Sequence, residues 1–340
     1  MMKRQKTIRT NCVGMLTLVF VLLTLNVSLV RAQRLTRQRL SLNAGWRFQK
    51  GDPAGTEGQL AYDRVKPWVT VTGNEFVREA AKTVRPEGNL GNTIVYTQAA
   101  FDDHGWRQLD LPHDWGIEGP FKQEYPGETG KLPWWGVGWY RKHFRVSPAE
   151  QGTQFYLDVD GAMAYAMVWL NGKFVGGWPY GYASFELDLT PYLNFDADNV
   201  IAIRLDNPPD SSRWYPGGGI YRNVWLVKTS PVHVSHWGTY ITTPEVTSSS
   251  ATIDLKVTVE NNSPSVAKVT IDSRAFEAGA NGQRSPRAST LFAPSTIEVG
   301  AGEQTTSTTS VRIEKPKRWN LQHRNLYSMV TTISRAGKIV

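Results

Sequence analysis

Cysteine is almost absent from this sequence, since Cys12 is the only one in 340 residues. A single cysteine excludes a disulfide framework and a cysteine-rich zinc site. The six histidines are scattered and no HExxH spacing or GxSxG motif occurs, which argues against a zinc hydrolase and a serine hydrolase. Gly217-Gly218-Gly219 lacks the Lys-Ser/Thr of a phosphate loop, so the usual signatures of metal, nucleophilic and nucleotide chemistry are missing.

Acidic residues are missing from the first 32 positions, although five basic residues lie there. The formal charge of the whole chain is +8, but the remainder carries 33 basic and 30 acidic residues. A folded part this close to neutral has no electrostatic footprint for nucleic acid. The charge pattern therefore excludes a nucleic-acid partner and directs attention to the N-terminus.

Residues 1–32 have the order of a secretory signal: basic residues, then an apolar run from Val13 to Val30, then Val30-Arg31-Ala32 as a cleavage site. Polar residues interrupt the run, so a retained membrane anchor is the weaker interpretation. We predict a signal peptide over 1–32 and a mature chain that starts near Gln33. The protein is then exported to the periplasm or the extracellular space, where a mature chain without cysteine suits an oxidising compartment.

Long amphipathic helices are also lacking, whereas 38 aromatic residues stand beside 30 Gly and 19 Pro. This composition favours many short strands and tight turns. Phe155, Leu157 and Val159 alternate with polar residues, which predicts a strand with one face in water. Asn171-Gly172 between apolar runs predicts a type I′ hairpin. We therefore expect an all-β fold in which residues 33–230 form a jelly-roll β-sandwich with a long surface insertion at about 50–100.

Tryptophan becomes scarce after Pro231, and Ser and Thr rise. Alternation from Ile253 to Val259 resumes after a turn, which predicts a second, immunoglobulin-like β-sandwich over 231–340. Tyr327–Ile333 is expected to be a strand, and Lys338–Val340 the start of a returning one. Because a domain seldom ends inside a hairpin, we predict that this sandwich is truncated at its end.

Two segments combine aromatic rings with charged groups, Leu111-Pro112-His113-Asp114-Trp115 and Ser211-Ser212-Arg213-Trp214-Tyr215-Pro216. Flat rings suit the C–H face of a pyranose, and Asp and Arg can hold its hydroxyl groups. The alternative, aromatic packing with a structural Arg–Asp pair, remains open from the residues alone.

These segments, together with Trp169-Leu170-Asn171-Gly172-Lys173 and Gly219-Ile220-Tyr221-Arg222, resemble glycoside hydrolase family 2, especially its β-galactosidases. The late Trp319-Asn320 to Leu326-Tyr327 stretch is similar to the end of that family's first immunoglobulin-like domain. The resemblance covers about Leu40 to Val340. It implies a sugar-binding jelly roll, an immunoglobulin-like domain and then a (β/α)₈ barrel with two catalytic glutamates, of which the barrel is missing from the sequence.

The resemblance implies no catalytic residue in this chain and a short set of sugar-contacting ones. Asp114 matches the Asn or Asp of the family's Pro-x-(Asn/Asp)-Trp loop, and His113 and Trp115 flank it. Arg213 and Trp214 occupy the loop where some β-galactosidases place a sodium-binding Asp. Because Ser212 and Arg213 stand there instead, no cofactor is expected, and a sodium or magnesium ion in the complete enzyme is unsupported.

The leading hypothesis is the N-terminal portion of a retaining, β-galactosidase-like hydrolase of terminal β-glycosides, inactive without its catalytic barrel. The expected partners are a carbohydrate and that barrel, and the oligomeric state stays open. One alternative is a non-catalytic carbohydrate-binding protein. The other is a β-glucuronidase or β-mannosidase of the same family, because the residues that choose the sugar lie mostly in the barrel.

Overall fold

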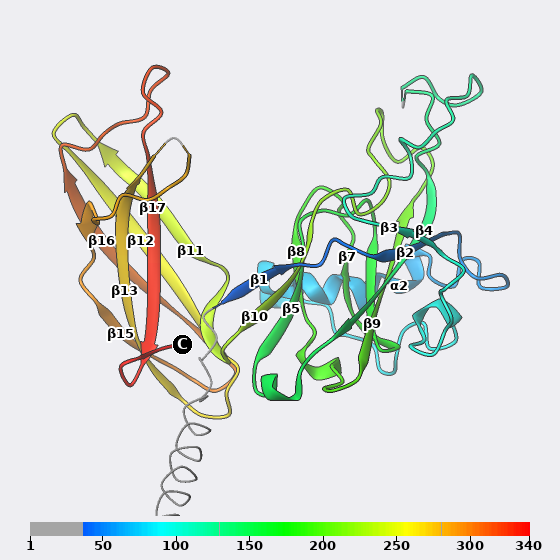
Figure 1. Ribbon diagram of the computed structural model, residues 1–340, viewed down its shortest axis with the longest axis horizontal. Coiled ribbons are helices and arrows are strands. Elements are labelled where there is room, and N and C mark those ends of the chain that lie inside the picture. Colours follow the sequence, from blue (N-terminus) through cyan, green and yellow to red (C-terminus); the bar gives the residue numbers. More distant parts are fainter. Residues whose placement is uncertain (1–36, 129, 280) are drawn as a thin grey trace, which may run out of the picture. The chain divides into compact units, whose positions relative to one another are not determined.

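The computed structural model describes residues 37–128, 130–279 and 281–340, so the expected signal peptide at 1–32 lies outside the described residues. The described chain is mostly β-strand, arranged as antiparallel sheets, with one α-helix (Figure 1). None of its helices is long and apolar enough to cross a membrane.

The part of the chain before Pro231 contains two sheets. The four-stranded sheet has the order β1 (Gln38–Ser41), β10 (Val224–Thr229), β5 (Gln154–Val159) and β8 (Phe185–Asp188). The six-stranded sheet has the order β3 (Arg107–Leu109), β2 (Trp46–Lys50), β4 (Gly136–Arg145), β9 (Asp198–Asn207), β6 (Ala166–Leu170) and β7 (Lys173–Trp178). Short 3₁₀ segments are η1 (Thr70–Phe76), η2 (Glu79–Ala81), η3 (Val95–Thr97), η4 (Pro148–Glu150) and η5 (Thr190–Tyr192).

The inner faces of these two sheets share one hydrophobic core. Leu157 and Leu226 enter it from the four-stranded sheet, and Val168, Ile203 and Leu205 from the six-stranded sheet. Each is buried, so the two sheets form a β-sandwich in which apolar side chains of both inner faces interdigitate.

The predicted hairpin at Asn171-Gly172 is confirmed. Leu170 pairs with Lys173, which leaves a two-residue turn between β6 and β7. Asn171 has φ 53° and Gly172 φ 79°, the two left-handed conformations that a type I′ turn requires.

The insertion expected at about 50–100 has most of its residues exposed or half-buried, but part of it packs into a core. It contains α2 (Tyr62–Val69) and buries Leu60, Val65 and Ile94 against Trp169 in a second core, on the outer face of the six-stranded sheet. Its few apolar residues are separated by Gly, Pro and charges, which hides the helical spacing of Val65 and Val69. At eight residues α2 is short, so it agrees with the expectation that long amphipathic helices are lacking.

Two buried ion pairs attach the insertion and its flanks to the sheet. The Arg204 guanidinium donates to the Asp52 carboxylate from Nε at 2.8 Å and from Nη2 at 2.7 Å. The Trp139 indole donates to the same carboxylate at 2.8 Å. Arg141 Nε donates to Asp103 at 2.7 Å, and both of these side chains are buried. Such geometry compensates charges that would be costly to bury alone.

The prediction of a water-exposed face on β5 was also wrong. Asp158 and Tyr156 are buried as well as the alternating apolar residues. Arg39, on the neighbouring part of the sheet, donates to Asp158 at 2.9 Å and lies 4.1 Å from the centre of the Trp225 ring. A long side chain can thus cover a polar strand face, which alternation alone does not reveal.

The part of the chain after Pro231 forms another two-sheet sandwich. One sheet has the order β11 (Val232–Val246), β12 (Ser250–Asn261) and β16 (Glu303–Glu314). The other has the order β14 (Thr290–Leu291), β13 (Ala267–Ala278), β17 (Leu326–Arg335) and β18 (Lys338–Ile339), with β15 (Ser295–Val299) also paired to β13.

The alternation predicted for this second sandwich is confirmed. Ile253, Leu255, Val257 and Val259 on β12 are buried, whereas the residues between them are more exposed. The late strand and its return are confirmed as well, since β18 pairs with the end of β17.

Candidate functional site

The two segments singled out in the sequence lie side by side at one end of the first sandwich. Gly136, where β4 begins, pairs with Asn207, where β9 ends, so the loops beyond them leave the sheet together (Figure 1). Backbone hydrogen bonds then join the segments: the amide of His113 donates to Ile220 at 2.9 Å, and that of Trp115 to Gly218 at 2.8 Å.

Asp114 links these segments through its carboxylate. Oδ1 accepts from the backbone amides of Gly116 at 2.9 Å and Gly218 at 3.0 Å. Oδ2 accepts from the Tyr215 hydroxyl at 2.5 Å. A carboxylate has about four lone-pair sites. The described residues therefore leave Oδ2 of this half-buried side chain one position for a further donor, such as a sugar hydroxyl.

The Tyr215 hydroxyl is held as a donor. Burial, the hydrogen bond to Asp114 and the charge of that carboxylate all raise the pKa of Tyr215. A deprotonated Tyr215 would face the Asp114 charge directly, so the hydroxyl keeps its proton and points it at Oδ2. Asp114 is thereby fixed in one orientation.

Two glycines of the Gly217-Gly218-Gly219 run are required by close approach. A Cβ on Gly218 would lie 2.8 Å from the Trp115 indole and from the Trp134 carbonyl oxygen. Gly219 has φ 129°, and a Cβ there would lie 2.5 Å from the carbonyl oxygen of His113 and from the Tyr140 hydroxyl. The run packs the second segment against the first, and no phosphate-binding role is needed to explain it.

His113 and Trp115, which we expected to contact substrate, are buried inside this pair of loops. The Trp115 indole donates to the Trp134 carbonyl at 3.0 Å, and Trp115 is only 1% exposed. His113 Nδ1 lies 2.7 Å from the Tyr140 hydroxyl and Nε2 lies 3.1 Å from Glu118 Oε1. The geometry gives both side chains a supporting role within the loop instead of a sugar-facing one.

Burial and the neighbouring charges set the protonation state of His113. Burial lowers the pKa of His113, although the Glu118 carboxylate opposes that effect. Hydrogen bonding to Arg107 holds the pKa of Glu118 below its ordinary value. His113 is therefore neutral at pH 7, with Nε2 donating to the Glu118 carboxylate and Nδ1 accepting from Tyr140.

Arg213 and Trp214, in the second segment, line a cavity of about 420 Å³ that we call the aromatic cavity. Three segments line it, within residues 163–165, 179–182 and 207–216. Trp214 is 62% exposed, and Arg213 has no hydrogen-bond or ion-pair partner among the described residues. Tyr215, which donates to Asp114, directly follows Trp214, so Asp114 and the cavity are connected through one loop.

Sequence reasoning missed Tyr180 and Tyr182, the other exposed rings of this cavity. Their ring centroids are 5.6 Å apart in an edge-to-face arrangement. It also missed Met163, which lines the cavity and contacts Gly181, where a Cβ would lie 2.3 Å from its sulfur. No local sequence pattern connects Tyr180 and Tyr182 to Trp214, so the residues alone carried no signal that they share a cavity.

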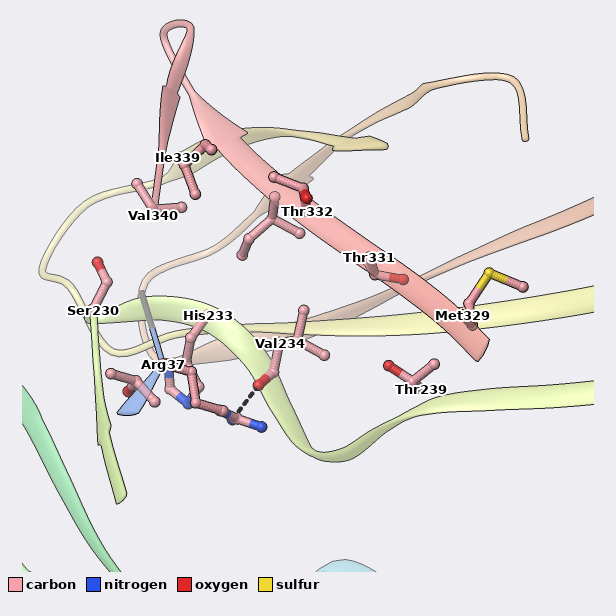
Figure 2. Close-up of a pocket in the computed structure, with 12 residues that line it drawn as sticks. Arg37, Ser230, His233, Val234, Thr239, Met329, Thr331, Thr332, Ile339 and Val340 are labelled. Carbon is pink, nitrogen blue, oxygen red and sulfur yellow. Dashed lines mark hydrogen bonds between the residues drawn. The ribbon is translucent and has the colours of Figure 1, made fainter. Parts of the chain in front are cut away.

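A second cavity, of about 370 Å³, lies beside β11 and β17 (Figure 2). Figure 2 shows Arg37 donating to the Val234 carbonyl, at 2.6 Å, with Thr239, Thr331 and Met329 around the space. Its described walls carry threonine hydroxyls and aliphatic groups but no pair of carboxylates. We assign no chemistry to it. Across residues 37–128, 130–279 and 281–340, no three His, Cys, Asp or Glu side chains are placed to hold a metal ion.

Comparison with known proteins shows what kind of molecule this is. Residues 232–340 match the family described as glycosyl hydrolases family 2, and residues 101–211 match the second all-beta domain of β-galactosidase. The chain is 44% identical over 250 residues to Beta-galactosidase BoGH2A of Bacteroides ovatus, which covers 73% of this chain and 28% of that protein. It is 31% identical over 253 residues to a putative β-glucuronidase of Formosa agariphila, covering 74% of this chain and 23% of that protein.

A solved structure agrees with these sequence matches. A family 2 glycosyl hydrolase from Bacteroides cellulosilyticus superimposes with a TM-score of 0.69 at 28% identity, over 90% of this chain and 34% of that one. The chain has two β-sandwiches in series, and it matches glycosidases in both sequence and structure. Together these findings show that it is a portion of a glycosidase. More particularly, the chain belongs to glycoside hydrolase family 2 and is a β-galactosidase-like N-terminal portion, whose second sandwich is the family's immunoglobulin-like domain. It spans less than a third of the length of these two curated relatives.

Proposed function

We propose that this chain is the sugar-contacting N-terminal portion of a retaining, β-galactosidase-like hydrolase that acts on terminal β-glycosides. In this proposal the first sandwich, over residues 33–230, is a jelly roll and the second covers 231–340. The two glutamates of the retaining reaction belong to a catalytic barrel that lies outside residues 1–340. The chain by itself is therefore expected to be inactive.

Asp114 is the observation that carries the proposal. Three donors fix its carboxylate, and one acceptor position remains on Oδ2 among the described residues. A charged acceptor that is already oriented loses little freedom when a sugar hydroxyl donates to it. Arg213 and Trp214 are exposed on the adjoining loop and can contribute a donor and a flat ring. We assign contact with substrate to these three residues.

The experiment is a kinetic one on the complete hydrolase. Asp114→Asn keeps an Oδ1 acceptor for the amides of Gly116 and Gly218 but removes the charge. Asp114→Ala removes the acceptor and the charge. Hydrogen bonds to charged groups are worth about 1.5 to 3 kcal/mol, so kcat/KM for an aryl β-galactoside should fall about tenfold or more. Glu124→Ala, an exposed carboxylate on the same loop with only a 3.9 Å ion pair, is the matched control.

Asp114 also supports the loop, so melting temperature is measured beside the kinetics. If Asp114→Asn melts with the parent enzyme and loses activity, a sugar contact is supported. Unchanged kcat and KM in both variants would refute the assignment.

β-Glucuronidase activity is the second candidate, because relatives named β-glucuronidase also match this chain. The same kinetic series therefore includes an aryl β-glucuronide. A preference for that substrate would replace the β-galactosidase assignment without altering the role of Asp114.

Export completes the proposal. The signal-like order of residues 1–32 supports secretion to the periplasm or the extracellular space, with cleavage near Gln33.

A further inference from the structure

Two loops at one end of the second sandwich carry an excess of positive charge. The loop after β13 and the loop before β17 meet there, because Ala278 at the end of β13 pairs with Leu326 at the start of β17 (Figure 1). Residues 277–291 and 314–327 contain six Lys or Arg and two Glu, whereas the whole chain after residue 32 has 33 basic and 30 acidic residues. The excess of positive charge after residue 32 therefore belongs to these two loops.

Most of these cations have no counter-ion. Glu277 is paired with Lys317 at 2.7 Å. Glu314 is paired with Arg312 at 2.9 Å. The other basic side chains of the two loops are exposed and have no ion-pair partner among the described residues: Arg284, Arg287, Lys315, Arg318 and Arg324. Like charges on neighbouring loops repel one another, so an anion bound between them relieves that repulsion as well as forming new contacts.

The same two loops enclose a groove of about 960 Å³, which we call the basic groove. Arg284, Arg324 and Lys317 line it, together with asparagine and glutamine side chains. Guanidinium, ammonium and amide groups are hydrogen-bond donors. The one carboxylate among the described lining residues, Glu277, is already neutralised by Lys317. The basic groove therefore selects a ligand that is rich in acceptors and negatively charged.

The backbone holds both groove arginines before a ligand arrives. Arg284 forms a β-bridge with the end of β13, and Arg324 forms one with Trp319. The Tyr327 hydroxyl accepts from the backbone amide of Lys317 at 2.9 Å, which ties the second loop to β17. Fixed positions reduce the ordering cost of binding, and each guanidinium presents a planar fork of donors that matches two oxygens of a carboxylate or sulfate group.

The shape and lining of the basic groove favour a polysaccharide chain. Sites of about 300 to 1,000 Å³ hold whole drug-sized ligands, so this groove is far larger than a single oxyanion needs. A flat lipid surface cannot enter a concave groove, whereas a linear polymer can lie along it. The amide side chains of the lining suit hydroxyl groups, which every unit of a polysaccharide carries and an acidic peptide lacks. Trp319, 57% exposed beside Arg318, adds a flat ring that suits the C–H face of a sugar unit.

We propose that the basic groove binds an anionic polysaccharide, one that carries carboxylate or sulfate groups along its length, with Arg284 and Arg324 donating to those groups. This inference goes beyond the proposed function, because it concerns the second sandwich alone and a ligand class defined by charge. It does not depend on Asp114, on the aromatic cavity or on the sugar that is hydrolysed.

The test measures binding of polygalacturonate, dextran sulfate and neutral dextran to the full chain and to the complete hydrolase by isothermal titration calorimetry at low salt. At least one of the acidic polymers is expected to bind both proteins, and neutral dextran to bind neither. Raising NaCl to about 1 M, where the Debye length falls to about 3 Å, should weaken binding by about tenfold or more.

Arg284→Ala and Arg324→Ala should each weaken binding of the acidic polymer by about threefold to tenfold, because charge-assisted hydrogen bonds are lost but solvent screens exposed charges. Arg324→Lys should lose part of the affinity, since it keeps the charge but not the planar fork of donors. Arg64→Ala is the matched control, because Arg64 on α2 is also exposed without an ion-pair partner among the described residues. It removes the same charge and should leave binding unchanged.

Several results would overturn the inference. One is that neither acidic polymer binds, or that Arg64→Ala weakens binding as much as the groove variants do. Binding by the full chain but not by the complete hydrolase would show that the rest of the protein covers the groove. Competition by inorganic sulfate at an equal concentration of sulfate groups would reduce the groove to a site for single ions. Equal binding of poly-glutamate or of anionic lipid vesicles would make charge alone the determinant. The kinetics of Asp114 variants enter none of these outcomes, so the two proposals fail separately.

Discussion

Asn207 offers a measure of how firmly the loop with Arg213 and Trp214 is anchored. Its side chain is 1% exposed, and its amide nitrogen donates to the carbonyls of Trp134 at 3.1 Å and Gly217 at 2.6 Å. The Trp134 carbonyl keeps a second donor, the Trp115 indole, but Asn207 is the donor found for the Gly217 carbonyl. Asn207→Ala thus leaves chiefly one buried acceptor without a partner.

The expected loss of stability follows from the one buried carbonyl that loses its donor. A buried acceptor left unsatisfied costs about 1 to 3 kcal/mol, so Asn207→Ala should lower the free energy of unfolding by about 2 kcal/mol. Asn207→Asp should cost more, about 3 kcal/mol or above, because it turns a buried charge toward two carbonyl oxygens.

Urea unfolding followed by tryptophan fluorescence is the appropriate assay, because 11 of the 13 tryptophans lie before Pro231. Asn92→Ala, an exposed asparagine with no side-chain hydrogen bond among the described residues, is the control. Trypsin should also cleave Asn207→Ala faster after Arg213. An Asn207→Ala variant within about 0.5 kcal/mol of the parent, the range of ordinary surface substitutions, would show that the loop is anchored by other contacts.

Two further predictions concern His113 and the N-terminus. Burial lowers the pKa of His113 below the ordinary value of about 6.5, so the unfolded chain binds more protons just below that pH, and the His113 contribution to stability is lost as pH falls through this window. Urea unfolding between about pH 5 and 8 should show that the free energy of unfolding declines toward low pH in the parent and in the exposed control His323→Gln. The decline should be smaller in His113→Gln. Equal slopes of the free energy of unfolding against pH in all three proteins would contradict the prediction. Mass spectrometry of the exported protein should find an N-terminus near Gln33, and a mature chain that retains Met1 would contradict cleavage.

Local sequence patterns were reliable where the responsible contacts are local. The Asn171-Gly172 hairpin depends on two adjacent residues that tolerate left-handed φ, and the period-two pattern of β12 depends on one strand with one core face. The same kind of pattern misled at β5, because distant residues cover its second face: Arg39 contacts Asp158, 119 residues away, and Asn262 donates to the Tyr156 hydroxyl.

The insertion shows a related limit. Leu60, Val65 and Ile94 are sparse and separated by turn-forming residues, so no hydrophobic period marks them as a core. They become one only because the outer face of the six-stranded sheet presents Trp139 and Trp169 to them. Burial of a segment against a sheet is a property of both partners, and only one of them is visible in the local sequence.

The candidate site divides in the same way. The amino-acid sequence was sufficient to single out the two segments that combine aromatic rings with charged groups, the glycine run that follows the second segment, and the family that they resemble. The tertiary structure decided which side chains turn inward, so that His113 and Trp115 are buried while Arg213 and Trp214 are exposed. It also brought Tyr180 and Tyr182 to the same cavity as Trp214. Side-chain identity is written in the chain, whereas exposure and neighbourhood arise only when distant strands pair and their loops meet.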